Sequence, residues 1–121
     1  MLINLTNHPL SIWDKKQIKT ANKLYGKIQD LPFPAISPDA DEKRVYALTI
    51  EYAKNVKKII SQSTDTNNAV HIMGELTFTF NLVQLLKTEN IQCIASTSKR
   101  NVVQTENKKQ TEFNFVKFRD Y

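Results

Sequence analysis

Glycine is scarce in this sequence, since only Gly26 and Gly74 occur among its 121 residues. The dinucleotide-binding GxGxxG loop and the triphosphate-binding GxxxxGK[ST] loop both need glycines at fixed spacings, and neither loop is present. The GxSxG nucleophile elbow of many hydrolases is missing as well. The commonest nucleotide-binding loops and this class of hydrolase site are therefore excluded.

Cysteine and histidine are rare too, because Cys93 is the single cysteine and His8 and His71 are the only histidines. They are too few and too poorly spaced for a structural zinc site, and a lone cysteine argues against a small secreted disulfide domain. No apolar run approaches the roughly 20 residues of a membrane span. Residues 1–6 lack the basic segment and apolar stretch of a signal peptide. We expect a cytoplasmic protein with no membrane association, and no motif requires a metal or a cofactor.

The overall composition is that of an ordinary folded domain, with 40% apolar and 24% charged residues. A chain of 121 residues suffices for one hydrophobic core, and no linker or repeat divides it, so residues 1–121 are expected to form a single domain. The formal net charge of +5 is scattered along the chain. This mild excess of positive charge raises the expectation of a phosphate-bearing ligand only slightly.

Short apolar runs alternate with amphipathic segments. We predict four strands from the apolar runs, at residues 2–5, 27–31, 69–73 and 91–95. The helical spacing of apolar side chains predicts three helices, at residues 14–25, from Asp39 or Asp41 to about residue 60, and at 77–87. A C-terminal hairpin is also predicted. Its two strands are residues 102–104 and 112–118, and its polar turn is at residues 107–109. This order predicts an α/β fold, a Rossmann-like three-layer sandwich with a mainly parallel sheet.

Polar side chains follow three of the four predicted strands. In an open parallel sheet, ligands bind beyond the carboxyl ends of the strands, at the switch in strand order. The residues placed there by the prediction are Thr6, Asn7 and His8 after the first strand, Gly74, Glu75, Thr77 and Thr79 after the third, and Ser96, Thr97, Ser98, Lys99 and Arg100 after the fourth. Asp30, after the second strand, is a weaker addition.

An anionic ligand suits this set of residues. Backbone N–H groups are open where the third helix starts after Gly74, and helix N-termini attract phosphate. The hydroxyl groups can donate to phosphate oxygens, and Arg100 can form a charge-assisted fork. The negative charge of Glu75 indicates that this residue meets another group, such as a ribose hydroxyl, a base amino group or a transferable proton.

Each of these residues also has a purely structural interpretation. Thr77 and Glu75 could serve only to cap the third helix. His8, next to a proline, could be an ordinary turn histidine, and residues 99–100 could be a solvated turn into the hairpin. His71, inside a strand, is interpreted as structural.

Three segments resemble the small CARF-like proteins of type III CRISPR systems. They are the strand-turn-helix unit at residues 70–80, the segment 93–100 and the C-terminal segment 113–121. Stand-alone members of that group include ring nucleases, which bind and cleave cyclic oligoadenylate second messengers. Many CARF domains carry an effector domain behind them, and this chain departs from that pattern.

The resemblance implies a homodimer that binds cyclic oligoadenylate, and cyclic tetra-adenylate is the expected ring. It also implies that the ring is cleaved without metal, by attack of a ribose 2′-hydroxyl on the adjacent phosphate. His8, Glu75 and Arg100 would be the catalytic candidates, and the other residues at the strand ends would bind the ligand. Three alternatives stay open: a non-catalytic sensor or regulatory module, a small nucleotide-processing enzyme, and direct nucleic-acid binding. No helix-turn-helix favours the last, and direct DNA binding is not expected.

Overall fold

All three α-helices begin at an acidic residue whose carboxylate accepts a hydrogen bond from a free backbone N–H group. Asp14 accepts from the N–H of Gln17, Asp41 from that of Arg44, and Glu75 caps the third helix in the same way. Acidic caps satisfy the unpaired N–H groups and favour the positive end of the helix dipole. The helix starts are therefore fixed by local sequence, as predicted for the first two helices.

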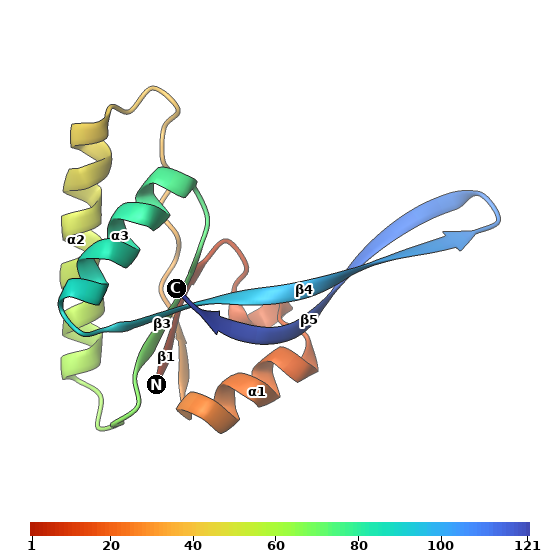
Figure 1. Cartoon of the computed structure of the whole chain (residues 1–121), viewed down its shortest axis with the longest axis horizontal. Helices are drawn as coiled ribbons and strands as arrows, with labels where there is room; N and C mark the ends of the chain where they lie inside the picture. Colours follow the sequence, from red (N-terminus) through yellow and green to blue (C-terminus); the bar gives the residue numbers. More distant parts are fainter.

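The structure is a computed structural model that describes residues 1–121 (Figure 1). Its elements are β1 (Leu2–Thr6), the 3-10 helix η1 (Leu10–Ile12), α1 (Lys15–Tyr25), β2 (Ile28–Asp30), α2 (Glu42–Ser61), β3 (Ala69–Met73), α3 (Leu76–Thr88), β4 (Gln92–Thr105) and β5 (Lys108–Asp120). None of the helices combines the length and the hydrophobicity that a membrane crossing requires.

The five strands form one sheet in the order β2-β1-β3-β4-β5. The first four are parallel, and β5 is antiparallel to β4. The chain moves outward from β1 to β2, then crosses back to β3 on the other side of β1. Strand order therefore reverses between β1 and β3, and this is the topological switch point of the sheet. The predicted Rossmann-like sandwich is confirmed.

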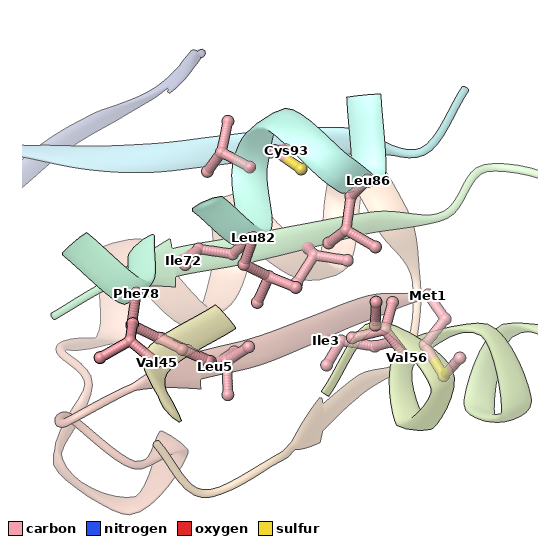
Figure 2. Packing of buried hydrophobic residues seen from close by; sticks show 13 residues of the cluster. Met1, Ile3, Leu5, Val45, Val56, Ile72, Phe78, Leu82, Leu86 and Cys93 are labelled. Atoms are coloured by element: carbon pink, nitrogen blue, oxygen red, sulfur yellow. The ribbon is translucent and has the colours of Figure 1, made fainter. Parts of the chain in front are cut away.

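The two faces of the sheet are covered by different helices, with α2 and α3 on one face and α1 on the other (Figure 1). Alternate residues of β1 divide accordingly, because successive side chains of a strand point to opposite faces. Ile3 and Leu5 pack in the larger core cluster with Phe78 and Leu82 of α3 (Figure 2). Leu2 packs in the smaller cluster beneath α1. The α1 face also carries polar side chains toward the end of β1, and this asymmetry positions the site.

One prediction about the fourth strand is wrong. The sequence predicts that the fourth strand ends at residue 95, yet β4 continues to Thr105. The hairpin turn lies at residues 106–107, earlier than the predicted 107–109. Beyond the body of the molecule β4 and β5 pair only with each other, and they project as a long two-stranded arm (Figure 1). All side chains of residues 98–114 are exposed. The two strands of the arm therefore have no buried face, and their sequence shows no apolar pattern.

Gly74, directly after β3, lies against the ring of Phe33. A Cβ atom added at Gly74 would overlap the Cζ and Cε atoms of that ring. The Phe33 ring in turn packs edge to face on Phe78, with 5.2 Å between the ring centroids.

We expect Gly74→Ala to lower the free energy of unfolding by about 1–3 kcal/mol, because the added methyl group overpacks the contact with Phe33. Chemical denaturation measures the change, and an unaltered midpoint and slope would contradict the expectation.

Candidate functional site

A cavity of about 600 Å³ opens at the switch point, beyond the carboxyl ends of β1 and β3. Its walls come from the ends of three parallel strands, from η1 and the start of α1, and from the base of the arm. The lining residues are Thr6, Asn7, His8, Ile12, Trp13, Asp14, Gln17, His71, Met73, Gly74, Ser96, Ser98 and Phe113. This volume lies in the range of small-molecule sites.

The loop that follows β1 is held in place by a network centred on Asn4. The Asn4 Nδ2 group donates to the His8 carbonyl at 2.9 Å and to Asp30 Oδ1 at 2.8 Å. The indole N–H of Trp13 donates to the same His8 carbonyl, also at 2.9 Å. The hydroxyl of Thr6 accepts from the His8 N–H at 3.1 Å. The backbone of His8 is thus fixed, while its imidazole remains exposed at the cavity.

His71 is the most buried polar side chain of the cavity, with 2% of its surface exposed. Its Nδ1 atom lies 3.1 Å from Asn4 Oδ1, and the rings of Trp13 and Phe118 meet it edge to face at 5.4 Å and 5.5 Å. Burial, and secondarily the charge of His8, lowers the pKa of His71 to about 4, so its ring is neutral near neutral pH. Its Nε2 atom has no hydrogen-bond partner.

Glu75 and Thr77 are engaged with each other at the start of α3 and do not line the cavity. The Glu75 carboxylate accepts from the N–H groups of Thr77 and Phe78 at 3.1 Å and 2.8 Å, and from the Thr77 hydroxyl. These hydrogen bonds lower the pKa of Glu75. The carboxylate takes the place at the helix N-terminus where phosphate was expected. Thr79 lies further along α3, buried away from the cavity.

The residues that follow Ala95 divide between the two faces of β4. Ser96 and Ser98 line the cavity, and the Ser96 hydroxyl donates to the Met73 sulfur at 3.2 Å. The Thr97 hydroxyl donates instead to the Lys117 carbonyl, at 3.2 Å. A register shift between residues 97 and 98 marks where the strands bend into the arm.

Arg100 and the neighbouring Lys99 lie on opposite faces of the arm. Arg100 lies two residues beyond Ser98 and pairs with Phe113, and both of these residues line the cavity. Residues two apart, and residues directly paired across antiparallel strands, share one face. Lys99 pairs with Asn114 on the opposite face of the arm.

The cavity therefore brings together half of the residues predicted at the strand ends. These six are Thr6, Asn7, His8, Gly74, Ser96 and Ser98. The other six, Glu75, Thr77, Thr79, Thr97, Lys99 and Arg100, are not part of the lining. Prediction missed the residues that the segment from η1 to the start of α1 and the arm contribute, namely Ile12, Trp13, Asp14, Gln17 and Phe113, and it assigned His71 only a structural role. The place of His71 in the site depends on the register of β1 and β3, which pairs Asn4 with His71.

The lining carries little charge. It contains no lysine or arginine, and its only carboxylate is that of Asp14. That carboxylate accepts from the N–H of Gln17 at 2.7 Å and from the N–H of Phe115 at 3.2 Å, so it joins α1 to the arm. No group of three His, Cys, Asp or Glu side chains is placed to hold a metal ion. The cavity thus presents hydroxyl, amide, imidazole and aromatic groups to a ligand.

Comparison with known proteins identifies the family. The sequence profile of the Uncharacterized protein MJ1673 family matches residues 1–119, and the chain belongs to that family. No curated protein and no solved structure gives a significant match to the chain.

Proposed function

We propose that this protein binds cyclic oligoadenylate, with cyclic tetra-adenylate as the first candidate, in the cavity at the β1/β3 switch point. The observation that carries the proposal is the position of this polar cavity, where sheets of this topology hold their ligands. The likeness of residues 70–80, 93–100 and 113–121 to ring nucleases supplies the ligand class. A ribose 2′-hydroxyl attacks the adjacent phosphate, forms a 2′,3′-cyclic phosphate and breaks the bond from phosphorus to the 5′-oxygen, which leaves as a hydroxyl. The reaction takes place in the cytoplasm.

Such a reaction depends mainly on aligning the 2′-hydroxyl with the phosphate and on stabilising the charge that develops there. In the proposed complex, Arg100 reaches from the arm to a phosphate oxygen. His8 moves the proton from the attacking 2′-hydroxyl toward the leaving 5′-oxygen, because its backbone is fixed while its imidazole is exposed. Glu75, already engaged by the N-terminus of α3, holds the turn after Gly74.

Phe113 supports a ligand that carries bases. Its ring is 69% exposed although it lines the cavity, which is unusual for a phenylalanine. An exposed aromatic face can stack on a nucleobase, and each such contact contributes about 1–3 kcal/mol. In the proposed complex Phe113 stacks on one adenine of the ring.

The proposed active form is a homodimer. The arm exposes Val102 and Val103, and a two-stranded hairpin without support is marginally stable in water. A second copy would cover these side chains, and a symmetric pair suits a ring of fourfold repeat. Light scattering at micromolar protein concentration tests this assembly, and a monomer both with and without ring would contradict it.

Incubation with cyclic tetra-adenylate in the presence of EDTA tests the proposed activity. Chromatography should reveal linear fragments that end in a cyclic phosphate, since the nucleophile comes from the ligand itself. A ring that remains intact with EDTA and with added divalent metal contradicts the proposed cleavage.

Arg100→Ala should weaken binding of cyclic tetra-adenylate by about tenfold or more, because a hydrogen bond to a charged group contributes about 1.5–3 kcal/mol. Lys99→Ala is the matched control, since it removes the same charge from the adjacent position, which is also exposed and lies on the other face of the arm. We expect it to change the affinity by less than about twofold in moderate salt, where distant charges are screened. Equal effects of the two substitutions would mean that Arg100 acts only through net charge.

A non-catalytic sensor is a second candidate, favoured by one observation. The lining contains no lysine or arginine that would stabilise the charge on a cleaved phosphate. A sensor would bind the ring tightly and release it uncut, so binding measured beside product analysis separates the two functions.

A further inference from the structure

His71 holds a hydrogen-bond acceptor that nothing in the protein satisfies. The side chain is 2% exposed, lines the cavity, and leaves Nε2 without a partner. A buried acceptor without a partner costs about 1–3 kcal/mol. Buried polar atoms of this kind are rare in folded proteins and need an explanation.

The surrounding network determines which ring nitrogen carries the proton. The Nδ2 group of Asn4 donates to Asp30 and to the His8 carbonyl, which orients the amide so that Oδ1 faces His71. Since Oδ1 can only accept, the hydrogen belongs on His71 Nδ1. The neutral ring therefore keeps a lone pair on Nε2.

The imidazole is also held rigidly. Trp13 and Phe118 meet it edge to face, and Trp13 is itself held by the hydrogen bond to the His8 carbonyl. Asp30 accepts from the Leu10 N–H and fixes the far end of the Asn4 network. A preorganised acceptor favours the ligand that brings a matching donor and disfavours one that leaves it unpaired.

We propose that Nε2 of His71 accepts a hydrogen bond from a ligand hydroxyl and thereby selects ribose over deoxyribose. This inference rests on the proposed function for the identity of the ligand, because the 2′-hydroxyl is the group that distinguishes RNA from DNA. His71 is thus a specificity-determining residue, separate from the His8 and Arg100 groups assigned to the reaction.

Trp13, the single tryptophan, lines the cavity and provides the signal for the test. Stopped-flow fluorescence gives the affinity for cyclic tetra-adenylate and for its all-deoxy counterpart before cleavage proceeds. The His71→Phe variant keeps an aromatic ring between Trp13 and Phe118 and removes the acceptor. We expect the preference of the wild type for the ribose ring to fall by about tenfold in this variant, which corresponds to about one hydrogen bond. An unchanged preference in a folded variant overturns the inference.

A second measurement separates failure of the inference from failure of the proposed function. The ¹⁵N resonance of His71 Nε2 is followed in the wild type during addition of the ribose ring or of adenosine. If the ring does not bind but adenosine shifts this resonance, the proposed function fails and the inference stands. If neither compound shifts it, the acceptor serves only water or remains unpaired, and the inference is overturned.

Discussion

Replacing Phe78 with alanine is expected to lower the free energy of unfolding by about 3–5 kcal/mol, the usual cost of removing a buried phenylalanine. Phe78 is fully buried at the start of α3. Its ring meets Phe33 at 5.2 Å and Tyr52 at 5.5 Å, so it connects α3 to α2 and to the loop that precedes α2. The substitution removes these contacts and leaves a cavity in the larger core cluster (Figure 2). Urea denaturation followed by circular dichroism measures the loss.

Phe80→Ala is the matched control, two residues further along the same helix. The Phe80 side chain is 62% exposed, and its truncation is expected to change stability by less than about 0.5 kcal/mol. Should Phe78→Ala not fold, Phe78→Leu retains part of the apolar volume and should give a smaller, measurable loss. Equal effects at positions 78 and 80 would contradict the packing described for α3.

Acid is expected to destabilise the protein through His71. Burial lowers the pKa of His71 from its ordinary value of 6.5 to about 4 in the folded state. Between these two values the unfolded chain binds a proton that the folded protein does not, so stability is lost as the pH falls. The loss attributable to His71 is about 3 kcal/mol between roughly pH 7.5 and pH 4, at about 1.4 kcal/mol per pH unit. Urea denaturation at several pH values measures it.

The His71→Phe variant isolates this contribution. Carboxylates such as Glu75, whose pKa is lowered by its capping hydrogen bonds, also lose stability at the acid end of the range. These carboxylates titrate in the wild type and the variant alike. The difference between the two proteins in the free energy of unfolding, followed against pH, therefore reports the titration of residue 71. The difference should grow as the pH falls from 6.5 toward 4. Parallel curves would show that the His71 ring protonates as easily in the folded protein as in the unfolded chain.

Local signals in the sequence suffice for most of the body of the fold. The apolar runs around Ile3 and Val70 belong to strands buried on both faces, and such runs need no tertiary information to be recognised. The stripe of Val45, Leu48 and Val56 marks the buried side of α2 in the same way. The arm was harder to predict, because its strands bury nothing and the polar residues after Ala95 have the composition of a turn.

The site was predictable only in part. The expectation that a ligand binds at the strand ends identified Thr6, Asn7 and His8, because these residues lie at and just after the end of β1, at the switch point. The role of His71 depends on its lateral contact with Asn4, a residue 67 positions away in the sequence. Phe113 reaches the cavity because β5 runs back antiparallel to β4 and pairs Phe113 with Arg100. Contacts of this kind depend on strand register, which a single sequence does not specify.

The central claim is that the switch-point cavity is the ligand site, and an NMR titration of ¹⁵N-labelled protein with cyclic tetra-adenylate tests it most directly. The account predicts that backbone resonances of Asn7, His8, Gly74 and Ser98 shift together and saturate with one binding curve. Residues of the separate groove beside α2, such as Ile36 and Leu48, should remain unchanged. Shifts confined to that groove, or no shifts at millimolar ring, would contradict the claim.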